Sequence, residues 1–459
     1  MSILLNAKPC KRLHFTGILG SGMSAIAQYC VWDGILVSGS DRLLSSPDVC
    51  DLQTKMEGLG CSLHAQDGSG VTSATDAIVV STAIEETNPD IAAARAAGVP
   101  VVHRSDVLAA IVESKRTIAV AGTSGKSTVT AMIWELLDAC GMSPSLISGA
   151  GLIRLEERGL VGNAFAGTSD LLVVEADESD GTCAKYKPFL SIFLNVSKDH
   201  KPIPETISLF STLARQSNVV LSNADDIRLA NFGATVTFGE NGTFVPDKIL
   251  SVAPSVSFAL RGVTYSLPLP GEHNLSNLLA ALCVCDFLGC NSECLVAGAA
   301  DYKGVQRRFA VTDVGRNIRL IDDYAHNPEK IRAAIRAARL FSGRLLAVFQ
   351  PHGFGPTRFL KDEFVAMFDT ELTNNDELFI LPIYYAGGTA QKDISSDIIV
   401  DLVKAKGKNA VAPFDRRELI ECLKKNVRPG DSVLVMGARD PSLPRLVEEI
   451  GTALQSLNV

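Results

Sequence analysis

The sequence predicts an α/β protein of three domains built on mostly parallel sheets. Apolar runs with strand character alternate with amphipathic, helix-like stretches along the chain. Glycine-rich turns join strand to helix in two places, and polar residues follow the ends of several other apolar runs. The length of 459 residues is also too great for one hydrophobic core and suggests about three domains.

The first segment begins with a short strand, Leu13–Thr16, that leads into Gly17, Gly20 and Gly22. The spacing G-x-x-G-x-G gives a tight turn before a helix, where backbone N–H groups can meet a phosphate. Asp41 ends the next strand, 19 residues after Gly22, and an acidic residue at about this distance commonly contacts a ribose hydroxyl. Glycine turns between strand and helix are common, so a purely structural role stays open.

The second segment opens with the most informative stretch, TIAVAGTSGKSTVTAMIWELL at 117–137. A β-run precedes G-T-S-G-K-S-T, and an amphipathic helix follows. The usual phosphate loop reads G-x-x-x-x-G-K-[S/T], so this loop is two residues short. It still supplies a small-residue turn, a lysine for the β- and γ-phosphates and a hydroxyl ligand for Mg²⁺. The residues concerned are Gly122, Gly125, Lys126, Ser127 and Thr128.

Acids and a histidine follow the next two strands. DLLVVEADESD at 170–180 runs into Glu175 and three further acids, and LSIFLNVSKDH at 190–200 ends in Asp199 and His200. Carboxylates at the carboxyl ends of buried strands lie where open α/β sheets bind ligands. We therefore expect Glu175 and His200 to approach a metal or phosphate, although a solvated acidic loop would give the same pattern.

A helix is expected to start near Asn274, after the break at Pro270-Gly271 in LPLPGEHNLSNLLAALCVCDFLG. His273 and Asn274 at its start either donate to a nucleotide base or only cap the helix, and the spacing does not separate these interpretations.

The third segment repeats the pattern of strands that end in polar residues. One strand leads into DDYAHNP at 322–328, and another ends at Gln350 before Pro351 and His352. Two more strands lie in DELFILPIYYAGGTA and DSVLVMGARD. Four strand ends thus place polar residues on one edge, which indicates a ligand-binding cleft.

Composition limits the partners. The chain is 46% hydrophobic and 20% charged, with a net charge of −8, so it lacks the basic surface that nucleic acid needs. No apolar run reaches the roughly 18 residues of a membrane helix, and we expect a cytoplasmic protein. Eleven cysteines lie mostly in apolar segments, which favours buried free thiols in a reducing compartment over metal ligands.

Along its full length the chain resembles the Mur ligase family. The motifs that carry the resemblance stand in the family's order: GILGSGMSAIA, VSGSD, VVSTAI, NPDIAAARAAGVPV, AVAGTSGKST, EADESD, GEHNLSNLLAAL, GVQRRF, DDYAHNP and FQPH. The resemblance implies a Rossmann-like UDP-binding domain at 1–112, a central ATPase domain at 113–304 and a C-terminal Rossmann-like domain at 305–459 that binds the amino substrate. It also explains the short loop, since the family's version reads G-T-x-G-K-[S/T], usually with His where this chain has Ser124.

The implied activity is ATP-dependent ligation of an amino acid such as L-alanine to the lactyl carboxylate of UDP-N-acetylmuramate, through an acyl phosphate, in peptidoglycan precursor synthesis. ATP and Mg²⁺ are the implied cofactors, and a monomer or weak homodimer is expected. The implied catalytic residues are Lys126, Glu175, His200 and His326. The implied Mg²⁺ ligands are Ser127, Glu175 and His200.

The resemblance also implies the residues of three binding sites. Those at the ATP site are Gly122, Thr123, Ser124, Gly125, Lys126, Ser127, Thr128, His273, Asn274, Arg308 and Asp322. Those at the UDP site are Gly17, Gly20, Gly22, Asp41, Ser81, Thr82, Ala83 and Ile84. Those at the amino-substrate site are His352 and Arg358, with His326 beside the incoming amino group.

Two departures from the family pattern bear on the amino substrate. DDYAHNP has Ala325 and Asn327 where the family usually has Gly and His. The usual FQPHRYTRT becomes FQPHGFGPTRF, so Gly353 replaces an arginine and an extra residue shifts Arg358. Arginines there would hold the substrate carboxylate.

These departures leave alternatives open. One is a recycling ligase that adds a tripeptide to the same nucleotide sugar, and another is a Mur-like ligase for a different carboxylate. A non-catalytic nucleotide-binding protein is disfavoured because Lys126, Glu175, His200 and Asp322 are all present.

Overall fold

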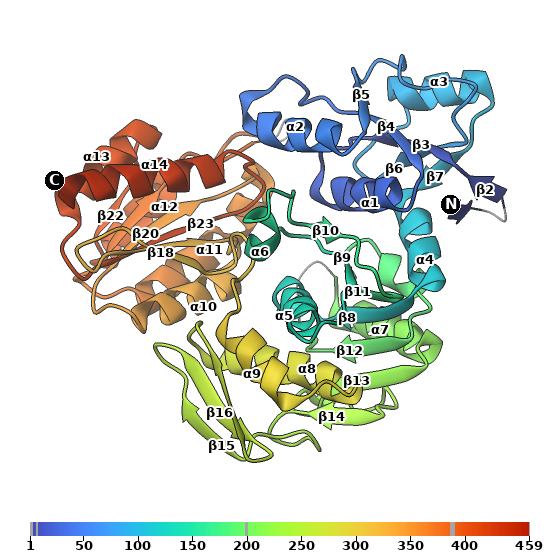
Figure 1. The fold of residues 1–459 in the computed structure, drawn as a ribbon. Coiled ribbons are helices and arrows are strands. Elements are labelled where there is room, and N and C mark those ends of the chain that lie inside the picture. The colour runs from blue at the N-terminus through green and yellow to red at the C-terminus, as the bar shows by residue number, and fades with distance from the viewer. Residues whose placement is uncertain (1–2, 6–7, 198–200, 386–390, 459) are drawn as a thin grey trace. The chain divides into compact units, whose positions relative to one another are not determined.

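The computed structural model describes residues 3–5, 8–197, 201–385 and 391–458. The chain divides into two compact units, residues 1–305 and 306–459. Two open, mostly parallel sheets with flanking helices lie in the first unit and one in the second, so the predicted α/β fold class is confirmed (Figure 1). The expected domain limits at 112 and 304 stay predictions.

The first sheet of unit one is wholly parallel, in the order β5-β4-β3-β6-β7. Its strands are β3 (Arg12–Thr16), β4 (Leu36–Ser40), β5 (Ser62–His64), β6 (Ala77–Val80) and β7 (Val101–His103). The helices of this part are α1 (Ser21–Trp32), α2 (Cys50–Gly58), α3 (Pro89–Ala97) and α4 (Arg104–Ser114). A hairpin of β1 (Ile3–Leu5) and β2 (Lys8–Cys10) precedes them. The strand order reverses beside β3, which is where open α/β sheets bind ligands.

The central sheet has the order β10-β9-β11-β8-β12-β13-β14. Its strands are β8 (Arg116–Ala121), β9 (Ser145–Ile147), β10 (Ala164–Phe165), β11 (Leu171–Ala176), β12 (Leu190–Phe193), β13 (Val219–Asn223) and β14 (Val236–Phe238). Only β10 runs antiparallel. Its helices are α5 (Lys126–Ala139), α6 (Ile153–Glu156), α7 (Ile203–Gln216), α8 (Glu272–Phe287) and α9 (Ser292–Ala300).

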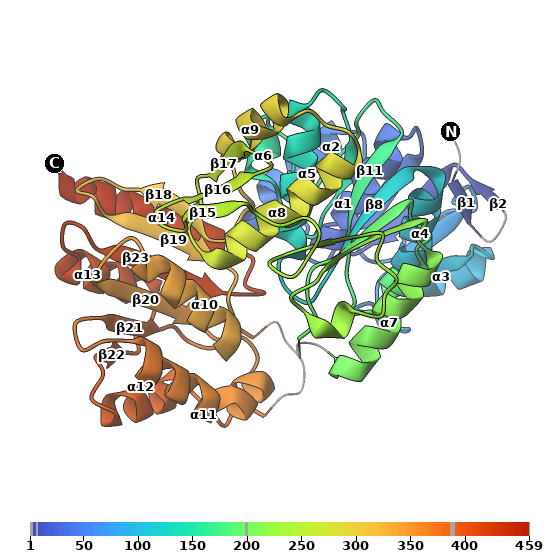
Figure 2. The same cartoon turned by 90° about the horizontal axis from the view of Figure 1, so that it is seen from below.

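Both faces of the central sheet are covered. Ile118 and Val120 of β8 pack in the core that includes α5, α8 and α9, whereas Ala119 and Ala121 pack in the core that includes α7 (Figure 2). Side chains alternate between faces along a strand, so a strand buried on both sides is apolar throughout.

One element of unit one was not predicted from the sequence. A three-stranded antiparallel sheet consists of β15 (Lys248–Ser251), β16 (Val256–Leu260) and β17 (Val263–Leu267). Val256, Phe258 and Leu260 alternate with less buried residues and pack in the core that includes α8 and α9.

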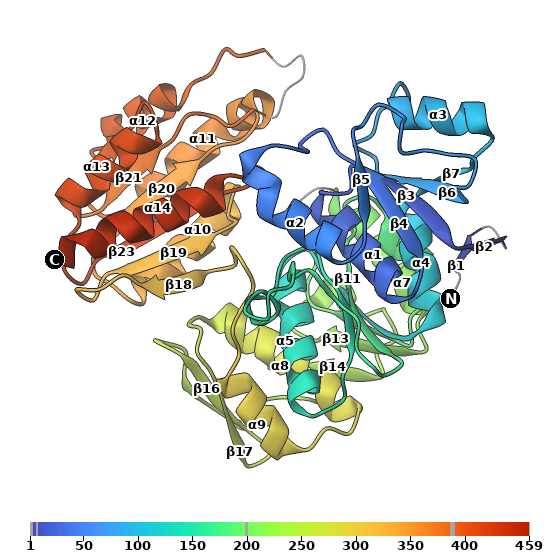
Figure 3. The same ribbon diagram turned by 45° about the horizontal axis from the view of Figure 1, so that its top comes forward.

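Unit two contains one sheet in the order β18-β19-β23-β20-β21-β22, with β18 antiparallel. Its strands are β18 (Ala310–Asp313), β19 (Arg319–Asp323), β20 (Leu345–Gln350), β21 (Glu377–Ile380), β22 (Ala410–Val411) and β23 (Ser432–Gly437). Its helices are α10 (Pro328–Arg339), α11 (Phe354–Glu371), α12 (Ser396–Ala405), α13 (Arg416–Asn426) and α14 (Leu443–Gln455). One face packs on α10, α11 and α12 and the other on α13 and α14 (Figure 3).

The expectation of free thiols is wrong for two of the cysteines. Cys140, at the end of α5, and Cys294, in α9, form a disulfide with Cα atoms 5.1 Å apart. Helices α5 and α9 pack on each other, which brings together two residues that lie 154 positions apart in the sequence. The other cysteines are free, and Cys283 and Cys285 are buried in α8 as expected for core residues.

Among the described residues, no helix is both long and apolar enough to span a membrane.

A buried carboxylate anchors α3 to the first sheet. The Asp90 side chain is fully buried and accepts hydrogen bonds from Thr16 Oγ1 at 3.0 Å and from Ser40 Oγ at 2.5 Å. The backbone N–H of Gly68 donates to it at 3.0 Å, and His14 Nε2 lies 3.4 Å away. Burial alone would raise the pKa of Asp90, but the hydrogen bonds and the nearby His14 outweigh it and lower that pKa.

We predict that Asp90→Asn lowers the free energy of unfolding by about 3 kcal/mol at pH 7, because it disrupts a buried charged network. The pKa of folded Asp90 lies below its unfolded value of about 3.9. The stabilisation is therefore complete above that value and is lost as the pH falls through the folded pKa. Urea unfolding of both proteins between pH 3 and 7 measures this. Asp51→Asn, at a side chain 82% exposed, is the matched control. If the difference in free energy of unfolding between wild type and Asp90→Asn stayed constant from pH 7 to pH 3, the prediction would be contradicted.

Candidate active site

The phosphate loop joins β8 to α5, as the sequence predicts, and its two glycines have left-handed backbones. Gly122 has φ +154° and Gly125 has φ +86°. A Cβ atom on Gly122 would lie 2.9 Å from Leu194 Cβ, and one on Gly125 would lie 2.8 Å from Asn277 Oδ1. Neither position accepts a side chain without strain, so the short loop depends on both glycines.

Asn195, just beyond β12, holds the middle of this loop. Its Oδ1 accepts hydrogen bonds from Thr123 Oγ1 and from the backbone N–H of Ser124, both at 2.9 Å. Its Nδ2 donates to the carbonyl oxygen of Ser124 at 3.0 Å. The amide therefore fixes the loop from the neighbouring strand end and leaves the Ser124 side chain exposed.

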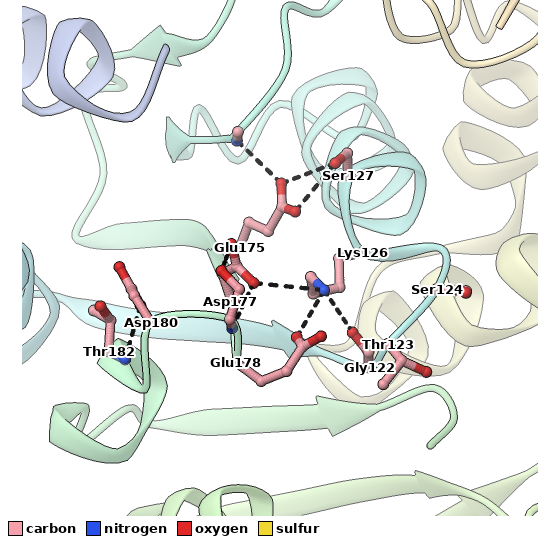
Figure 4. Close-up of polar contacts among 12 residues, drawn as sticks. Gly122, Thr123, Ser124, Lys126, Ser127, Glu175, Asp177, Glu178, Asp180 and Thr182 are labelled. Carbon is pink, nitrogen blue, oxygen red and sulfur yellow. Dashed lines mark hydrogen bonds and ion pairs between the residues drawn. The ribbon is translucent and has the colours of Figure 1, made fainter. Parts of the chain in front are cut away.

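Lys126 is the first residue of α5 and is held by an acidic partner (Figure 4). Its Nζ donates to the Gly122 carbonyl oxygen and to Glu178 Oε2, both at 2.8 Å, and lies 3.8 Å from Asp177 Oδ1. Burial alone would lower the pKa of Lys126, but Glu178, Asp177 and Glu175 outweigh it and raise that pKa. The lysine is therefore a firmly charged cation at the base of the loop.

Ser127 and Glu175 lie together beside the lysine (Figure 4). Ser127 Oγ donates to the two carboxylate oxygens of Glu175 at 3.1 and 3.0 Å, and the Gly149 N–H donates to Oε2 at 3.0 Å. A hydroxyl and a carboxylate are the oxygen donors that Mg²⁺ prefers, so these two residues fit the predicted metal site. The third predicted ligand, His200, lies outside the described residues. Thr128 follows in the first turn of α5.

An open cleft adjoins Glu175 and Asp177, and Gly22 and Arg104 also line it. Arg104 Nη2 pairs with Asp180 Oδ2 at 2.5 Å. A Cβ atom on Gly22 would collide with Arg104 Nη1, so glycine at this position makes room for the arginine. The cleft thus combines the predicted metal site with a cation and a predicted UDP-site residue.

The rest of the predicted UDP site gathers at the carboxyl ends of β3, β4 and β6. Gly17, with φ +80°, donates its N–H to the Ser40 carbonyl oxygen at 2.8 Å. Asp41 accepts from the N–H of Leu19 at 3.0 Å, inside the glycine turn that also contains Gly20. The turn after β6, on the other side of β3, lies close to the Gly17 turn. It contains Ser81, Thr82, Ala83 and Ile84, and a Cβ atom on Gly17 would lie 3.4 Å from Ile84 Cδ1.

His273 and Asn274 are in the first turn of α8, and Gly271 rather than either of them is its N-cap. Asn274 Nδ2 donates to the Pro270 carbonyl oxygen at 2.8 Å, and Asn277 Nδ2 donates to Asn274 Oδ1 at 3.3 Å. Asn277 in turn lies against Gly125. The start of α8 therefore adjoins the phosphate loop through Asn277, which is compatible with the predicted role of His273 and Asn274 beside a nucleotide base.

Unit two places Asp322 and Arg308 near the end of β19. Asp322 is buried, which raises its pKa, and Arg307 Nε lies 3.4 Å from its Oδ1. Arg307 also donates to the Gly437 carbonyl oxygen at 2.7 Å. The guanidinium of Arg308 lies 5.2 Å from the centre of the Tyr324 ring.

The same edge of unit two contains the predicted histidines. The rings of His326 and His352 meet edge to face with centres 5.4 Å apart. His326 Nδ1 lies 2.9 Å from the Tyr324 carbonyl oxygen. Arg358, the predicted carboxylate anchor, lies apart in α11, where it pairs with Asp393 and donates to the Gln391 carbonyl oxygen at 2.9 Å.

Sequence reasoning missed Asn195, Arg104 and the specific role of Glu178. All three lie one or two residues after a strand end, and a strand end is also the signal that identified Glu175. A lone amide or a lone arginine after a strand carries no specific signal of a ligand site. Glu178 was noted only as one of four acids, and the structure gives it the contact with Lys126.

Family models match three successive stretches of the chain. The model described as the catalytic domain of the Mur ligase family matches residues 12–116, and the Mur ligase middle domain matches 120–285. The model described as the glutamate ligase domain of Mur ligases matches 307–439.

Curated and solved proteins match nearly the whole chain. UDP-N-acetylmuramate–L-alanine ligase of Paenarthrobacter aurescens is 36% identical over 96% of this chain and 97% of its own length. The enzyme of the same name from Arthrobacter sp. is 35% identical over 92% and 90%. The crystal structure of the UDP-N-acetylmuramate–alanine ligase of Thermotoga maritima matches with a TM-score of 0.80 and 26% identity, over 97% and 99%. A murein peptide ligase of Psychrobacter arcticus has the same fold, with a TM-score of 0.68 and 19% identity over 97% and 99%.

We predict that Lys126→Ala lowers ATP turnover by on the order of 100- to 1000-fold, because it removes a fixed cation from the phosphates. It also leaves the buried Glu178 carboxylate without its cation, so a lower melting temperature is expected. Lys126→Ala combined with Glu178→Gln removes both charges and should recover stability but not turnover. Lys187→Ala, which breaks an exposed pair with Glu113, is the control. Substantial turnover in the folded double variant would refute the phosphate-loop assignment.

Proposed function

The chain belongs to the Mur ligase family, and from this membership we propose that it is an ATP-dependent ligase joining L-alanine, or a similar amino acid, to the lactyl carboxylate of UDP-N-acetylmuramate. Relatives that match nearly the whole chain are named for this activity. The observation that carries the proposal is the short phosphate loop, whose Lys126 and Ser127 meet acidic partners beside the open cleft.

The reaction requires activation because a carboxylate resists attack by an amine through its charge and resonance. In the proposed sequence a carboxylate oxygen of the nucleotide sugar attacks the γ-phosphorus of ATP, and ADP leaves. The amino nitrogen then attacks the carbonyl carbon of the acyl phosphate. The tetrahedral intermediate collapses with loss of inorganic phosphate, and the nitrogen loses a proton.

Lys126 has a defined part in the first step. It is held as a cation by Glu178, at the point where the loop meets α5. Phosphate oxygens are stronger partners for this lysine than one carboxylate, so bound ATP replaces Glu178 as its main contact. Lys126 then offsets the negative charge that gathers on the transferred phosphoryl group.

Ser127 and Glu175 are the described residues that would hold Mg²⁺, and His200 remains a proposed third ligand. When bound, the ion would neutralise charge on the β- and γ-phosphates. Glu175 also lines the cleft, so the same carboxylate borders the space for the acceptor.

The nucleotide sugar is proposed to bind across the carboxyl ends of β3, β4 and β6. The turn at Gly17 would meet the diphosphate, and Asp41 would meet the ribose of the UDP moiety. Arg104 and the cleft would take the muramyl end, which would bring its carboxylate near Glu175.

We further propose that the protein acts in the cytoplasm, where ATP and nucleotide sugars are available, as a monomer or weak homodimer. Its net charge of −8 gives no reason to expect a nucleic-acid partner.

A ligase that adds a tripeptide to the same nucleotide sugar is the second candidate. Gly353 stands where the family usually places an arginine, and the smaller residue leaves more space for a peptide.

Phosphate release with ATP, Mg²⁺ and UDP-N-acetylmuramate, across single amino acids and the muramyl tripeptide, tests the proposal. We expect release with L-alanine, glycine or L-serine. Release with the tripeptide alone would identify the second candidate. No release with any amine, despite ATP binding, would overturn both.

We predict that Glu175→Gln raises the Mg²⁺ concentration for half-maximal activity by about tenfold, because the amide keeps the shape but loses the charge that attracts the ion. Titration with Mg²⁺ at fixed ATP measures this. Glu113→Gln, which changes an exposed acid, should leave the Mg²⁺ dependence unchanged. An unaltered dependence in Glu175→Gln would remove this residue from the metal site.

A further inference from the structure

The amino-substrate site lacks the arginine that its sequence motif leads one to expect. Gly353 has φ +72° and its N–H donates to the Tyr384 carbonyl oxygen at 2.8 Å, so a left-handed turn precedes α11 there. The nearest arginine in the motif, Arg358, already pairs with Asp393. A substrate carboxylate would have to break that ion pair to use Arg358.

A second arginine stands on the neighbouring strand end. Gln350, the last residue of β20, is the register partner of Gly437, the last residue of β23. His352 and Arg439 each follow two residues later, so both lie just beyond the same edge of the sheet, where His352 forms a parallel bridge with Tyr384. The guanidinium is close enough that its charge, together with the larger effect of burial, lowers the pKa of His352.

Arg439 carries its charge without a partner within the described part of the chain. It is exposed and makes no hydrogen bond or ion pair with the described residues. Its backbone is left-handed, with φ +64°, a conformation that disfavours a residue other than glycine by about 1 kcal/mol. An unpaired cation in an unfavourable backbone conformation at a ligand-binding edge is a feature that folding alone does not explain.

A buried amide, whose oxygen is unsatisfied within the described part of the chain, lies beneath the same edge. Gln350 is buried and donates its amide N–H to the Pro382 carbonyl oxygen at 3.5 Å, which leaves its Oε1 as the acceptor. That Oε1 has no hydrogen-bond partner among the described residues. This oxygen is itself buried, so with respect to the residues that the structure describes it is an unsatisfied polar group beneath the edge rather than a contact for the substrate.

We propose that Arg439 binds the carboxylate of the amino substrate and so replaces the arginine missing at Gly353. This inference rests on the proposed ligase function. It also specifies the substrate class as a free amino acid. In a peptide the carboxyl next to the attacking amine is an amide, which carries no charge for a guanidinium to bind.

The test compares Arg439→Gly with the wild-type enzyme in phosphate release, using L-alanine and L-alaninamide as the amines. Glycine removes the guanidinium and suits the left-handed backbone, so the fold is expected to survive. The KM for L-alanine should rise about 10- to 100-fold, while those for ATP and the nucleotide sugar change less than about twofold. The wild-type preference for L-alanine over L-alaninamide should fall by the same factor. Arg439→Lys should keep part of that preference.

Arg316→Gly is the matched control. Arg316 is also exposed with φ +54°, but it lies in the turn between β18 and β19, at the opposite end of the sheet. It should leave every KM unchanged. An Arg439→Gly enzyme that keeps its preference for L-alanine over L-alaninamide would overturn this inference alone. If the wild-type enzyme released no phosphate with any amino acid, the proposed function itself would be overturned.

Discussion

The position of β8 between β11 and β12 is the constraint on which the nucleotide site depends. Because β9 and β10 follow β8 in the chain but lie beyond β11, the strand order reverses at β8. The segments after β11 and β12 then lie on either side of the phosphate loop. Glu175 approaches Ser127 from one side, and Asn195 clamps Thr123 and Ser124 from the other. The loop can be two residues short because a neighbouring strand end supplies the amide that fixes it.

The two cationic side chains near the phosphate loop and the cleft each form an ion pair with an acidic residue. An acidic protein that binds a triphosphate must hold positive charge locally, and here Lys126 pairs with Glu178 and Arg104 with Asp180. Each pair keeps a charged side chain in place and offsets part of the desolvation penalty of burying it. In the proposed function, binding would be an exchange of partners, in which the ligand's charge competes with a carboxylate of the protein. This exchange favours highly charged ligands such as polyphosphates over weaker anions.

From the sequence we could predict the residues that lie at strand ends and in glycine turns. We could predict few of the contacts that depend on packing between residues far apart in the sequence. The phosphate loop, Glu175, Asp41 and the strand ends of unit two follow from local pattern, and each lies in the structure where that pattern places it. The Cys140–Cys294 disulfide was missed because it depends on the packing of α5 against α9. The sheet of β15, β16 and β17 was missed because short alternating strands resemble loop sequence. Glu178 was not distinguished from its acidic neighbours because only the fold shows which carboxylate reaches Lys126.

The pairing of β20 with β23 explains how a binding arginine can stand after a different strand while the fold stays the same. In a parallel sheet the carboxyl ends of paired strands lie at one edge, so the residues that follow two neighbouring strands come out at the same edge. His352 and Arg439 stand in this relation, so an arginine lost after β20 can be compensated after β23 while both strands keep their pairing. The left-handed backbone at Arg439 is then a local penalty offset by the function of its side chain. If Arg439 binds the substrate carboxylate as proposed, substrate selection depends on which strand end carries the cation, whereas the sheet beneath it, buried on both faces, stays the same.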